Sequence, residues 1–389
     1  MLLLHTSDWH LGRSLHRVDL SSAQAAFLDS LVEVVRREKV DVVLVAGDVY
    51  DRAIPPVTAV ALFEDALFRL RAAGARVVVT SGNHDSARRL GFGSRLVDAS
   101  GVHLRTAAGG VADPVVVEDT HGPVGIYALP YLEPEAARYE LPAAPGGSSE
   151  APARDHAAVL QRAMDCVHAD RRERRLGRSV VLAHAWVTGG ALSESERDIS
   201  VGGVGSVPAH LFGGVDYAAL GHLHGPQQVE ETVRYSGSPL AYSFSEAAHR
   251  KGSWLVELDA TGLRRVEKVE APVPRRLATL RGSLDELLAS PAHGAHESDY
   301  LSVVLTDPAR PEDAMLRLRR RFPHVLVLDW APEGGLSDDR TYRARVRGRT
   351  DVEVAEGFVA HVRRTAATDL ERALLGEALA DGVRAEAAA

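Results

Sequence analysis

The first 270 residues alternate short apolar runs with longer amphipathic segments, and this alternation restricts the possible folds more than any other feature. Val40–Ala46 is an almost continuous Val/Leu run, as expected for a strand that is buried on both faces. The preceding segment, Ser21–Lys39, has apolar residues at three- and four-residue spacing, which is typical of a helix. Helix-like Val57–Ala73 and strand-like Arg76–Thr80 follow. With a strand at Leu2–Thr6, this order predicts an α/β fold whose sheet begins with parallel strands.

The rest of the chain extends this pattern and then departs from it. Further strands are expected at Val115–Val117, Val124–Leu129, Val180–Ala183, Tyr217–Leu220 and Trp254–Leu258. Ala271–Pro274 has the composition of a linker, and a compact α+β pattern follows it. Two amphipathic helices are expected at Val352–Arg364 and Asp369–Ala380. We therefore expect three domains, over residues 1–270, 275–332 and 340–389.

Composition excludes several classes of protein. The chain of 389 residues is 45% hydrophobic and 25% charged, close to the average for soluble globular proteins. Its single cysteine, Cys166, excludes a disulfide scaffold and a multi-cysteine metal site. The N-terminus lacks the basic region of a signal peptide and no apolar stretch reaches about 18 residues, so we expect a cytoplasmic protein. The net charge of -8 argues against a protein that simply coats nucleic acid, but it allows an enzyme that meets phosphates through bound cations.

Five short polar clusters each follow a predicted strand. They are Ser7–His10, Ala46–Asp48, Ser81–Asp85, Ala183–Ala185 and Gly221–His224. In α/β folds, ligand sites form at the carboxyl ends of the strands. We therefore expect these clusters to converge in space, although they are widely separated along the chain.

Seven side chains in these clusters are candidate metal ligands. They are Asp8, His10, Asp48, Asn83, His184, His222 and His224. Carboxylate, imidazole and amide groups suit divalent ions such as Mn²⁺, Fe²⁺ or Zn²⁺. A single ion does not need seven ligands, whereas two ions that share a bridging carboxylate do. Such pairs lie about 3.5–4 Å apart and stabilise both the attacking and the leaving oxygen of a displacement at phosphorus.

The order Asp-x-His, Gly-Asp, Gly-Asn-His-Asp, His and Gly-His-x-His resembles the signature of the calcineurin-like metallophosphoesterases. The flanking segments His5–Arg13, Tyr235–Leu240 and Ser243–Glu246 are similar to those of the SbcD family, the nuclease subunits of bacterial SbcCD exonucleases. This resemblance covers residues 1–258 most strongly. It implies a metallophosphoesterase β-sandwich flanked by helices, a small α+β capping domain that binds DNA, and C-terminal helices that bind the partner SbcC.

The resemblance also implies a role for each site residue. For one ion it implies the ligands Asp8, His10 and His224, for the other Asn83, His184 and His222, and between the two ions the bridging Asp48. His84 would be the catalytic histidine that stabilises the phosphate and helps the leaving oxygen to depart. Asp85 would hydrogen-bond the ring of His84 and fix its tautomer.

The activity implied by the resemblance is that of a metal-dependent DNA nuclease in repair, recombination and replication. It would act as a 3′–5′ exonuclease on double strands and as an endonuclease on single strands and hairpins, with Mn²⁺ as the favoured metal. The sequence has no G-x-x-x-x-G-K-[ST] motif, so ATP-dependent action would require the ATPase SbcC. A homodimer through the helices after the first two motifs is expected by analogy. Two alternatives stay open: a phosphoesterase for small nucleotides, and a binding scaffold without catalysis.

Several other residues have an ordinary explanation beside a functional one. His5 is expected in the core or next to the ligands, and Cys166 is expected as a small core residue. Arg13 and Arg89 flank ligand loops and could contact phosphates, although solvated charge is the commoner role. The basic helix at Arg317–Arg321 could bind DNA or present a polar face to solvent. The apolar stripe of the C-terminal helices suggests either docking of a partner or packing onto this chain.

Overall fold

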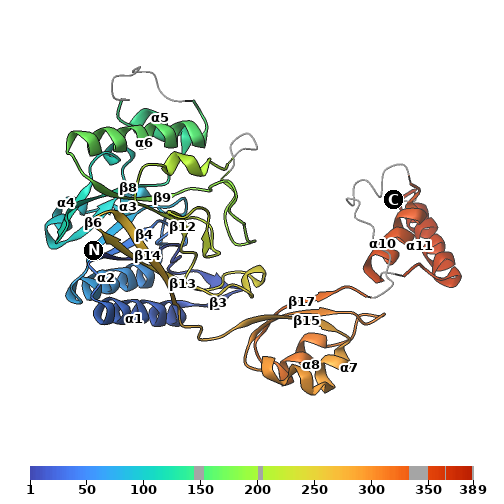
Figure 1. Ribbon diagram of the computed structural model, residues 1–389. Helices are drawn as coiled ribbons and strands as arrows, with labels where there is room; N and C mark the ends of the chain where they lie inside the picture. Colours follow the sequence, from blue (N-terminus) through green and yellow to red (C-terminus); the bar gives the residue numbers. More distant parts are fainter. Residues whose placement is uncertain (144–152, 200–204, 333–348, 364, 388–389) are drawn as a thin grey trace. The chain divides into compact units, whose positions relative to one another are not determined.

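The computed structural model describes residues 1–143, 153–199, 205–332, 349–363 and 365–387 (Figure 1). The chain divides into two compact units, Met1–Pro274 and Arg275–Ala389. The boundary lies directly after the linker-like stretch Ala271–Pro274. Among the described residues, no helix is long and apolar enough to cross a membrane.

The first unit contains two six-stranded sheets. One has the order β14 (Gly262–Glu270), β13 (Gly252–Asp259), β1 (Leu2–Thr6), β4 (Val42–Ala46), β5 (Arg76–Thr80) and β6 (Val102–Arg105). The other has the order β11 (Gln227–Gln228), β12 (Val233–Tyr235), β10 (Tyr217–Gly221), β9 (Arg178–His184), β8 (Gly122–Leu129) and β7 (Val115–Asp119). The central strands of each sheet are parallel, and antiparallel strands lie only toward the margins.

Helices cover the outer faces of this sandwich (Figure 1). On the first sheet lie α1 (Ser21–Glu38) and α2 (Val57–Ala72), and on the second lie α5 (Pro134–Glu140) and α6 (His156–Glu173). Between the sheets, Leu44, Leu182 and Val256 belong to one continuous apolar core. The shorter elements of the unit are β2 (Ser14–Leu15), β3 (Val18–Asp19), α3 (Ala87–Leu90), α4 (Ser94–Val97) and the 3₁₀ turns η1 (Asp98–Ser100), η2 (Ala108–Gly110), η3 (Ala209–Phe212) and η4 (Phe244–Glu246). The expected sandwich flanked by helices is therefore confirmed.

The strands that the sequence predicted are those with apolar runs. All five residues of β4 are buried because the sandwich core covers one face and helices cover the other. The parallel start β1–α1–β4–α2–β5 follows the predicted order. Strands β6 and β14 were not predicted, nor were the short strands β2, β3, β11 and β12. Strand β14 is the outermost strand of its sheet and carries mostly polar, partly exposed residues, so it has no apolar run to reveal it.

The second unit begins with a small three-stranded sheet. Its elements are β15 (Leu277–Gly282), α7 (Leu284–Ala289), η5 (Pro291–His296), β16 (Tyr300–Leu305), α8 (Ala314–Arg321) and β17 (Val325–Trp330). All three strands are parallel, with β16 in the centre. Leu287 and Leu318 from the helices pack with Leu301 and Val303 of the sheet. The predicted compact α+β pattern is confirmed here.

Two C-terminal helices complete the described part of the second unit. They are α10 (Asp351–Arg363) and α11 (Asp369–Ala387), and both predicted helices are confirmed. None of the α10 residues is buried, whereas Ala367 between the helices is buried. Residues 340–348 of the expected third domain, together with Arg364 and residues 388–389, lie outside the described residues.

Candidate metal centre

The carboxyl ends of five parallel strands bring the predicted ligands together. Strands β1, β4 and β5 of the first sheet end beside β9 and β10 of the second. The loop after β1 is joined to the loop after β4, because the amide of Asp8 donates to Gly47 O (3.1 Å) and that of His10 donates to Asp48 O (3.0 Å). His184 connects the two sheets through its Nδ1, which lies 3.1 Å from Ala46 O. The seven predicted ligands therefore surround one small region.

The backbone of the ligand loops is strained. Asp8, His10 and Asp48 have φ values of 52°, 44° and 47°, and His222 has a φ of 107°. Residues other than glycine rarely adopt positive φ, and such residues cluster at functional sites. Gly47 has a φ of 84°, and a Cβ atom there would lie 2.3 Å from the Nδ1 of His184. The loops are thus shaped to turn these side chains toward a common centre.

Two groups of ligand atoms lie beside Asp48, and Asp8 of the first group is also within 4.8 Å of Asp48 and His184. In the first, Nε2 of His10 is 3.1 Å from Nε2 of His224, and Asp8 lies within 4.8 Å of both. In the second, Oδ1 of Asn83 is 2.9 Å from Nε2 of His184 and 3.2 Å from Nδ1 of His222.

Asp48 faces both groups with one oxygen. Its Oδ2 lies 3.6 Å from Nε2 of His10 and 3.6 Å from Nε2 of His184. A second carboxylate, Asp8, is fully buried nearby. A carboxylate oxygen equidistant from a ligand of each group is placed where it could bridge two cations.

The electrostatics of the site favour bound cations. Burial, followed by the charge of Asp48, raises the pKa of Asp8 well above its usual value. Burial and neighbouring imidazoles lower the pKa of His10 and His222 well below the usual value, so both rings are neutral at pH 7. Neutral imidazole is the form that binds metals. Divalent cations would satisfy the carboxylates and the facing ring nitrogens together, so the residues fit the expected metals.

Comparisons with known proteins agree with this geometry. The calcineurin-like phosphoesterase family model matches residues 1–226. The model described as the type 5 capsule protein repressor C-terminal domain matches residues 273–363. The SbcD subunit of the nuclease SbcCD from Staphylococcus saprophyticus is 32% identical over 331 residues, which cover 84% of each chain. The chain belongs to the SbcD family of calcineurin-like phosphoesterases.

Solved structures give more distant matches. A protein of Thermus thermophilus is 15% identical, with a TM-score of 0.37, over 69% of this chain and 98% of its own. A dimetal phosphatase from Danio rerio is also 15% identical, with a TM-score of 0.39, over the same shares of the two chains. Membership of the SbcD family, together with the Asp/His clusters, identifies the chain as a metal-dependent phosphodiester hydrolase of the nuclease type.

In this SbcD-family chain, the prediction that Asp85 hydrogen-bonds the ring of His84 is wrong. The Asp85 carboxylate accepts backbone amides from Val49 (3.0 Å), Tyr50 (2.9 Å) and Gly82 (3.0 Å). The Nδ1 of His84 instead lies 2.8 Å from the carbonyl oxygen of Asp51. Three amides converge on Asp85 because the loops after β4 and β5 turn around it. Asp85 therefore joins these two loops, and a backbone carbonyl orients His84.

His84 lies at the rim of the same centre. Its backbone amide donates to Oδ1 of Asp48 (2.8 Å), and its ring meets the His10 ring edge-to-face with centroids 4.7 Å apart. His84, His10 and Asp48 also form a third group whose ligand atoms lie within 4.8 Å of one another. The ring therefore reaches the place where the seven predicted ligands meet.

Three residues that contact the ligands were not predicted. Ser195 Oγ lies 2.5 Å from Nδ1 of His224, and Oε1 of Glu196 accepts the His224 amide (2.7 Å). Gln24 of α1 donates to His10 O (2.8 Å) and accepts from the Gly12 amide (3.1 Å). Ser195 and Glu196 belong to a polar loop without periodicity. The buried position of Gln24 on the apolar side of its helix is a signal that could have been noticed.

For most residues for which the sequence allowed both an ordinary and a functional role, the structure decides between the two. His5 is a core residue, with Nδ1 2.9 Å from Tyr217 Oη and Nε2 3.1 Å from Leu220 O. Cys166 is buried on α6 as expected. Arg13 stacks over the Tyr242 ring (4.9 Å to its centroid) and donates to Ser195 O (3.0 Å), so it supports the site from within. Arg89 is exposed and donates to a backbone carbonyl.

Proposed function

We propose that this chain hydrolyses DNA phosphodiester bonds by a two-metal mechanism. The observation that carries the proposal is the position of Asp48 Oδ2, 3.6 Å from a histidine nitrogen of each ligand group. One ion would be held by Asp8, His10 and His224, the other by Asn83, His184 and His222, with Asp48 between them. Mn²⁺ suits these ligands and is the ion that we propose.

The protein's own residues orient the reaction. The metals, when bound, would lower the pKa of a water molecule and neutralise charge on the phosphate oxygens. His84 donates Nδ1–H to Asp51 O, which leaves Nε2 for the substrate. In its protonated form, His84 donates a proton from Nε2 to the departing 3′ oxygen of the sugar. Asp85 keeps the loops that carry Asp48 and His84 together.

A DNA digestion assay tests this proposal. End-labelled duplex, hairpin and single-stranded DNA are incubated with Mn²⁺ or EDTA, with and without SbcC and ATP. We expect 3′–5′ degradation of duplex and endonuclease cleavage of hairpins and single strands, with Mn²⁺ only. Hydrolysis of a small phosphodiester without cleavage of any DNA would overturn the nuclease proposal and favour the small-nucleotide alternative. No hydrolysis of either substrate would favour the binding scaffold.

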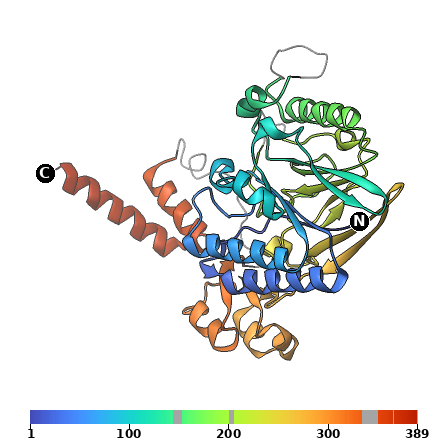
Figure 2. The ribbon, with the colours of Figure 1, turned by 90° about the vertical axis from the view of Figure 1, so that its left-hand side faces the viewer.

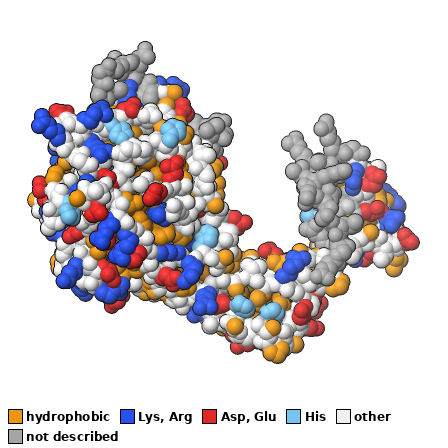
Figure 3. All heavy atoms as spheres, viewed as in Figure 1, with side chains coloured by type: hydrophobic (Ala, Val, Ile, Leu, Met, Phe, Trp, Pro, Cys, Tyr) orange, Lys and Arg blue, Asp and Glu red, His pale blue; other side chains and the backbone are white. Residues whose placement is uncertain are grey.

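DNA contact by the small sheet domain, residues 275–332, is part of the proposal, but its basic helix offers little free charge. Arg317 pairs with Asp285 (2.7 Å), and Arg321 pairs with Glu297 (3.0 Å). Arg319 donates to Val325 O (3.3 Å). Arg320 is exposed, and among the described residues it has no ion-pair partner. Figure 3 shows basic and acidic side chains interspersed on the face in view, without a continuous basic strip. Phosphate contact by this domain is therefore proposed for Arg320 and for the exposed Arg276, Arg281 and Arg310 outside the helix.

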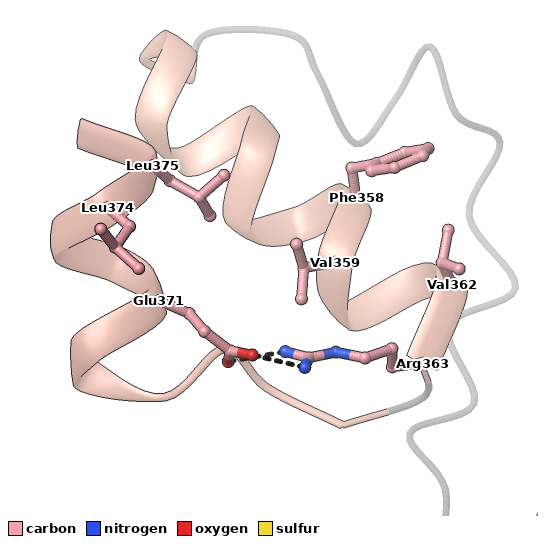
Figure 4. Close-up of a pocket in the computed structure, with 7 residues that line it drawn as sticks. All are labelled: Phe358, Val359, Val362, Arg363, Glu371, Leu374 and Leu375. Atoms are coloured by element: carbon pink, nitrogen blue, oxygen red, sulfur yellow. Dashed lines mark hydrogen bonds and ion pairs between the residues drawn. The ribbon is translucent and has the colours of Figure 1, made fainter. Parts of the chain in front are cut away.

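The C-terminal helices are proposed to bind SbcC. Phe358, Val359 and Val362 of α10 and Leu374 and Leu375 of α11 line an apolar groove of about 380 Å³ (Figure 4). An ion pair between Arg363 and Glu371 (2.6 Å) closes one end of it. An apolar groove between two helices suits the apolar face of a partner helix. SbcC is the partner that family membership suggests, and we propose that the two chains meet in the cytoplasm.

A homodimer is also proposed. The expected interface was the helices after the first two motifs, α1 and α2, but exposed apolar side chains favour α2 with the short helices α3 and α4 in place of α1. On α2, Val57 and Phe68 are 84% and 72% exposed and lie on the side opposite the core. Phe92 and Leu96 are 88% and 85% exposed, and Figure 2 shows α2 and this segment on the side facing the viewer. The outer face of α1, in contrast, is polar. Light scattering should give twice the monomer mass for wild type and the monomer mass for Phe68→Arg; a monomeric wild type would contradict the dimer.

A further inference from the structure

His224 is held by hydrogen bonds at each of its backbone groups and at one ring nitrogen. Its amide donates to Oε1 of Glu196 (2.7 Å), and its carbonyl oxygen accepts from Nζ of Lys251 (2.8 Å). Its ring Nδ1 meets Oγ of Ser195 at 2.5 Å. These contacts leave Nε2 facing His10 in the first ligand group. His224 is therefore fixed from three directions by residues outside the five sequence clusters.

A buried ion pair lies behind Ser195. Oγ of Ser195 contacts Oε1 of Glu246 at short distance, and Nζ of Lys251 contacts Oε2 of the same carboxylate. Glu246 is fully buried and the Lys251 side chain is 3% exposed. Glu246 belongs to the segment Ser243–Glu246, which the SbcD resemblance includes and to which the mechanism assigns no role.

The direction of the protons follows from the donors available. Ser195 has one hydroxyl proton, and besides His224 it faces Ser193 Oγ at 3.0 Å and the closer carboxylate of Glu246. A carboxylate can only accept and is the stronger acceptor, so the proton goes to Glu246. The Ser195 oxygen must then accept from His224, which places the ring proton on Nδ1. Nε2 consequently keeps its lone pair for a metal. We infer that Glu246, acting through Ser195, is a positioning residue that sets the tautomer and orientation of His224.

His184 provides an internal comparison. Its Nδ1 faces the carbonyl oxygen of Ala46, which also only accepts, so the same tautomer is set there by the backbone. The tautomer of His184 cannot be reversed by a side-chain substitution, whereas that of His224 can. We call the hydrogen-bond chain Glu246–Ser195–His224 the relay. It predicts that the substitution Glu246→Gln affects the two ligand groups differently.

In Glu246→Gln the direction of the hydrogen bonds in the relay should reverse. Lys251 requires an oxygen as its partner, so the new amide keeps its oxygen toward Lys251 and turns its NH₂ group toward Ser195. The Ser195 hydroxyl then donates to Nδ1 of His224, and the ring proton moves to Nε2. That tautomer cannot bind a metal through Nε2. Because outer hydrogen-bond partners of metal ligands typically change affinity by about 10–100-fold, we expect a loss of this size for one Mn²⁺ of two.

The experiment uses the full chain and two readouts. Mn²⁺ titration with EPR detection counts bound ions, and long-range ¹H–¹⁵N correlation of ¹⁵N-histidine-labelled, metal-free protein reports the His224 tautomer, assigned by its loss in His224→Asn. We expect an Nδ1–H ring and two ions in wild type, and an Nε2–H ring with one weakened ion in Glu246→Gln. Ser195→Ala, which removes the hydroxyl, should weaken the same ion. It also provides the test if Glu246→Gln does not fold.

Asp119→Asn is the matched control, because it makes the same carboxylate-to-amide change in a largely buried pair with Arg178 (2.5 Å) at the opposite end of β9 from His184. It should leave both ions and the tautomer unchanged. Unchanged Mn²⁺ affinity and tautomer in Glu246→Gln, or equal weakening of both ions, would overturn the relay. Because this role rests on the proposed two-metal site, the tautomer is read without metal. Failure of wild type to bind two ions would contradict the metal site but not the proton arrangement.

Discussion

The metal centre and the C-terminal helices α10 and α11 differ in how far their side chains are buried and held by other parts of the chain. At the metal centre, buried side chains contact one another, and backbone groups of the chain itself hold them. In the helical hairpin, none of the α10 residues is buried, and apolar side chains from both helices face an open groove. The first region would be completed by small ions, whereas the described side chains of α10 contribute no buried residue to a core in the second. The proposed chemistry therefore depends on residues within the first unit, whereas the proposed binding of SbcC depends on an exposed groove in the second.

Asp48→Ala should have the largest effect and should be confined to the metal centre. Without the carboxylate between the two ligand groups, DNA cleavage should fall at least about a thousandfold, because the ions lose their common ligand. Gel assays with Mn²⁺ measure cleavage, and pull-down of SbcC serves as the control. Retained cleavage would contradict the bridging role of Asp48. Loss of SbcC binding would contradict the independence of the metal centre and the C-terminal helices.

His84→Ala should separate catalysis from metal binding within the same centre. The ring touches the centre but is proposed as an acid rather than a ligand, so turnover should fall by about 10²–10⁴-fold. Elemental analysis should still find two Mn²⁺ ions per chain. Loss of one ion in this variant would show that His84 is a ligand, as its proximity to His10 and Asp48 allows.

Leu374→Asp should affect only association. Placing a carboxylate in the apolar groove should weaken SbcC binding by roughly 100-fold, the effect expected of a central interface position. Leu370→Asp is the matched control, because Leu370 lies on the same helix, is 72% exposed and does not line the groove. Titration calorimetry measures binding, and hydrolysis of a small phosphodiester should stay unchanged in both variants. Equal weakening by both substitutions would contradict a specific groove.

Asp8→Asn should give the smallest effect, a gain in stability without metal. Burial and Asp48 raise the pKa of Asp8, so the ionised carboxylate destabilises the metal-free fold above that pKa. The variant should be more stable by about 1 kcal/mol at pH 8 in EDTA. As the pH falls, wild-type Asp8 becomes protonated and the difference should shrink. Thermal unfolding at pH 8 and pH 5 measures this; a variant less stable than wild type at pH 8 would contradict it.

Much of the fold could be predicted because its central strands are apolar runs that end in polar clusters. Val42–Ala46 and Tyr217–Gly221 are examples, and both lie in the middle of a sheet. The order of the strands could not be derived from periodicity, which is a local property. The two-sheet arrangement came from the resemblance, and exposed outer strands such as β14 gave no signal.

In the candidate site, too, local sequence features were predictable and features that depend on the tertiary fold were not. The positions of the seven ligands after strands indicated that they would meet, because parallel strands end at a common edge. The positive φ values of Asp8, His10, Asp48 and His222 depend on the tertiary fold and were not predicted. The partner of Asp85 was predicted wrongly because three backbone amides, arranged by two loops, compete for it successfully. Ser195 was missed because its loop has no periodicity.

Anomalous diffraction from crystals of the Mn²⁺-loaded protein tests the two-metal site most directly. We predict two manganese peaks about 3.5–4 Å apart. Asp8, His10 and His224 should contact one ion, Asn83, His184 and His222 the other, and Asp48 both. A single peak, or two peaks of which Asp48 contacts only one, would contradict the account.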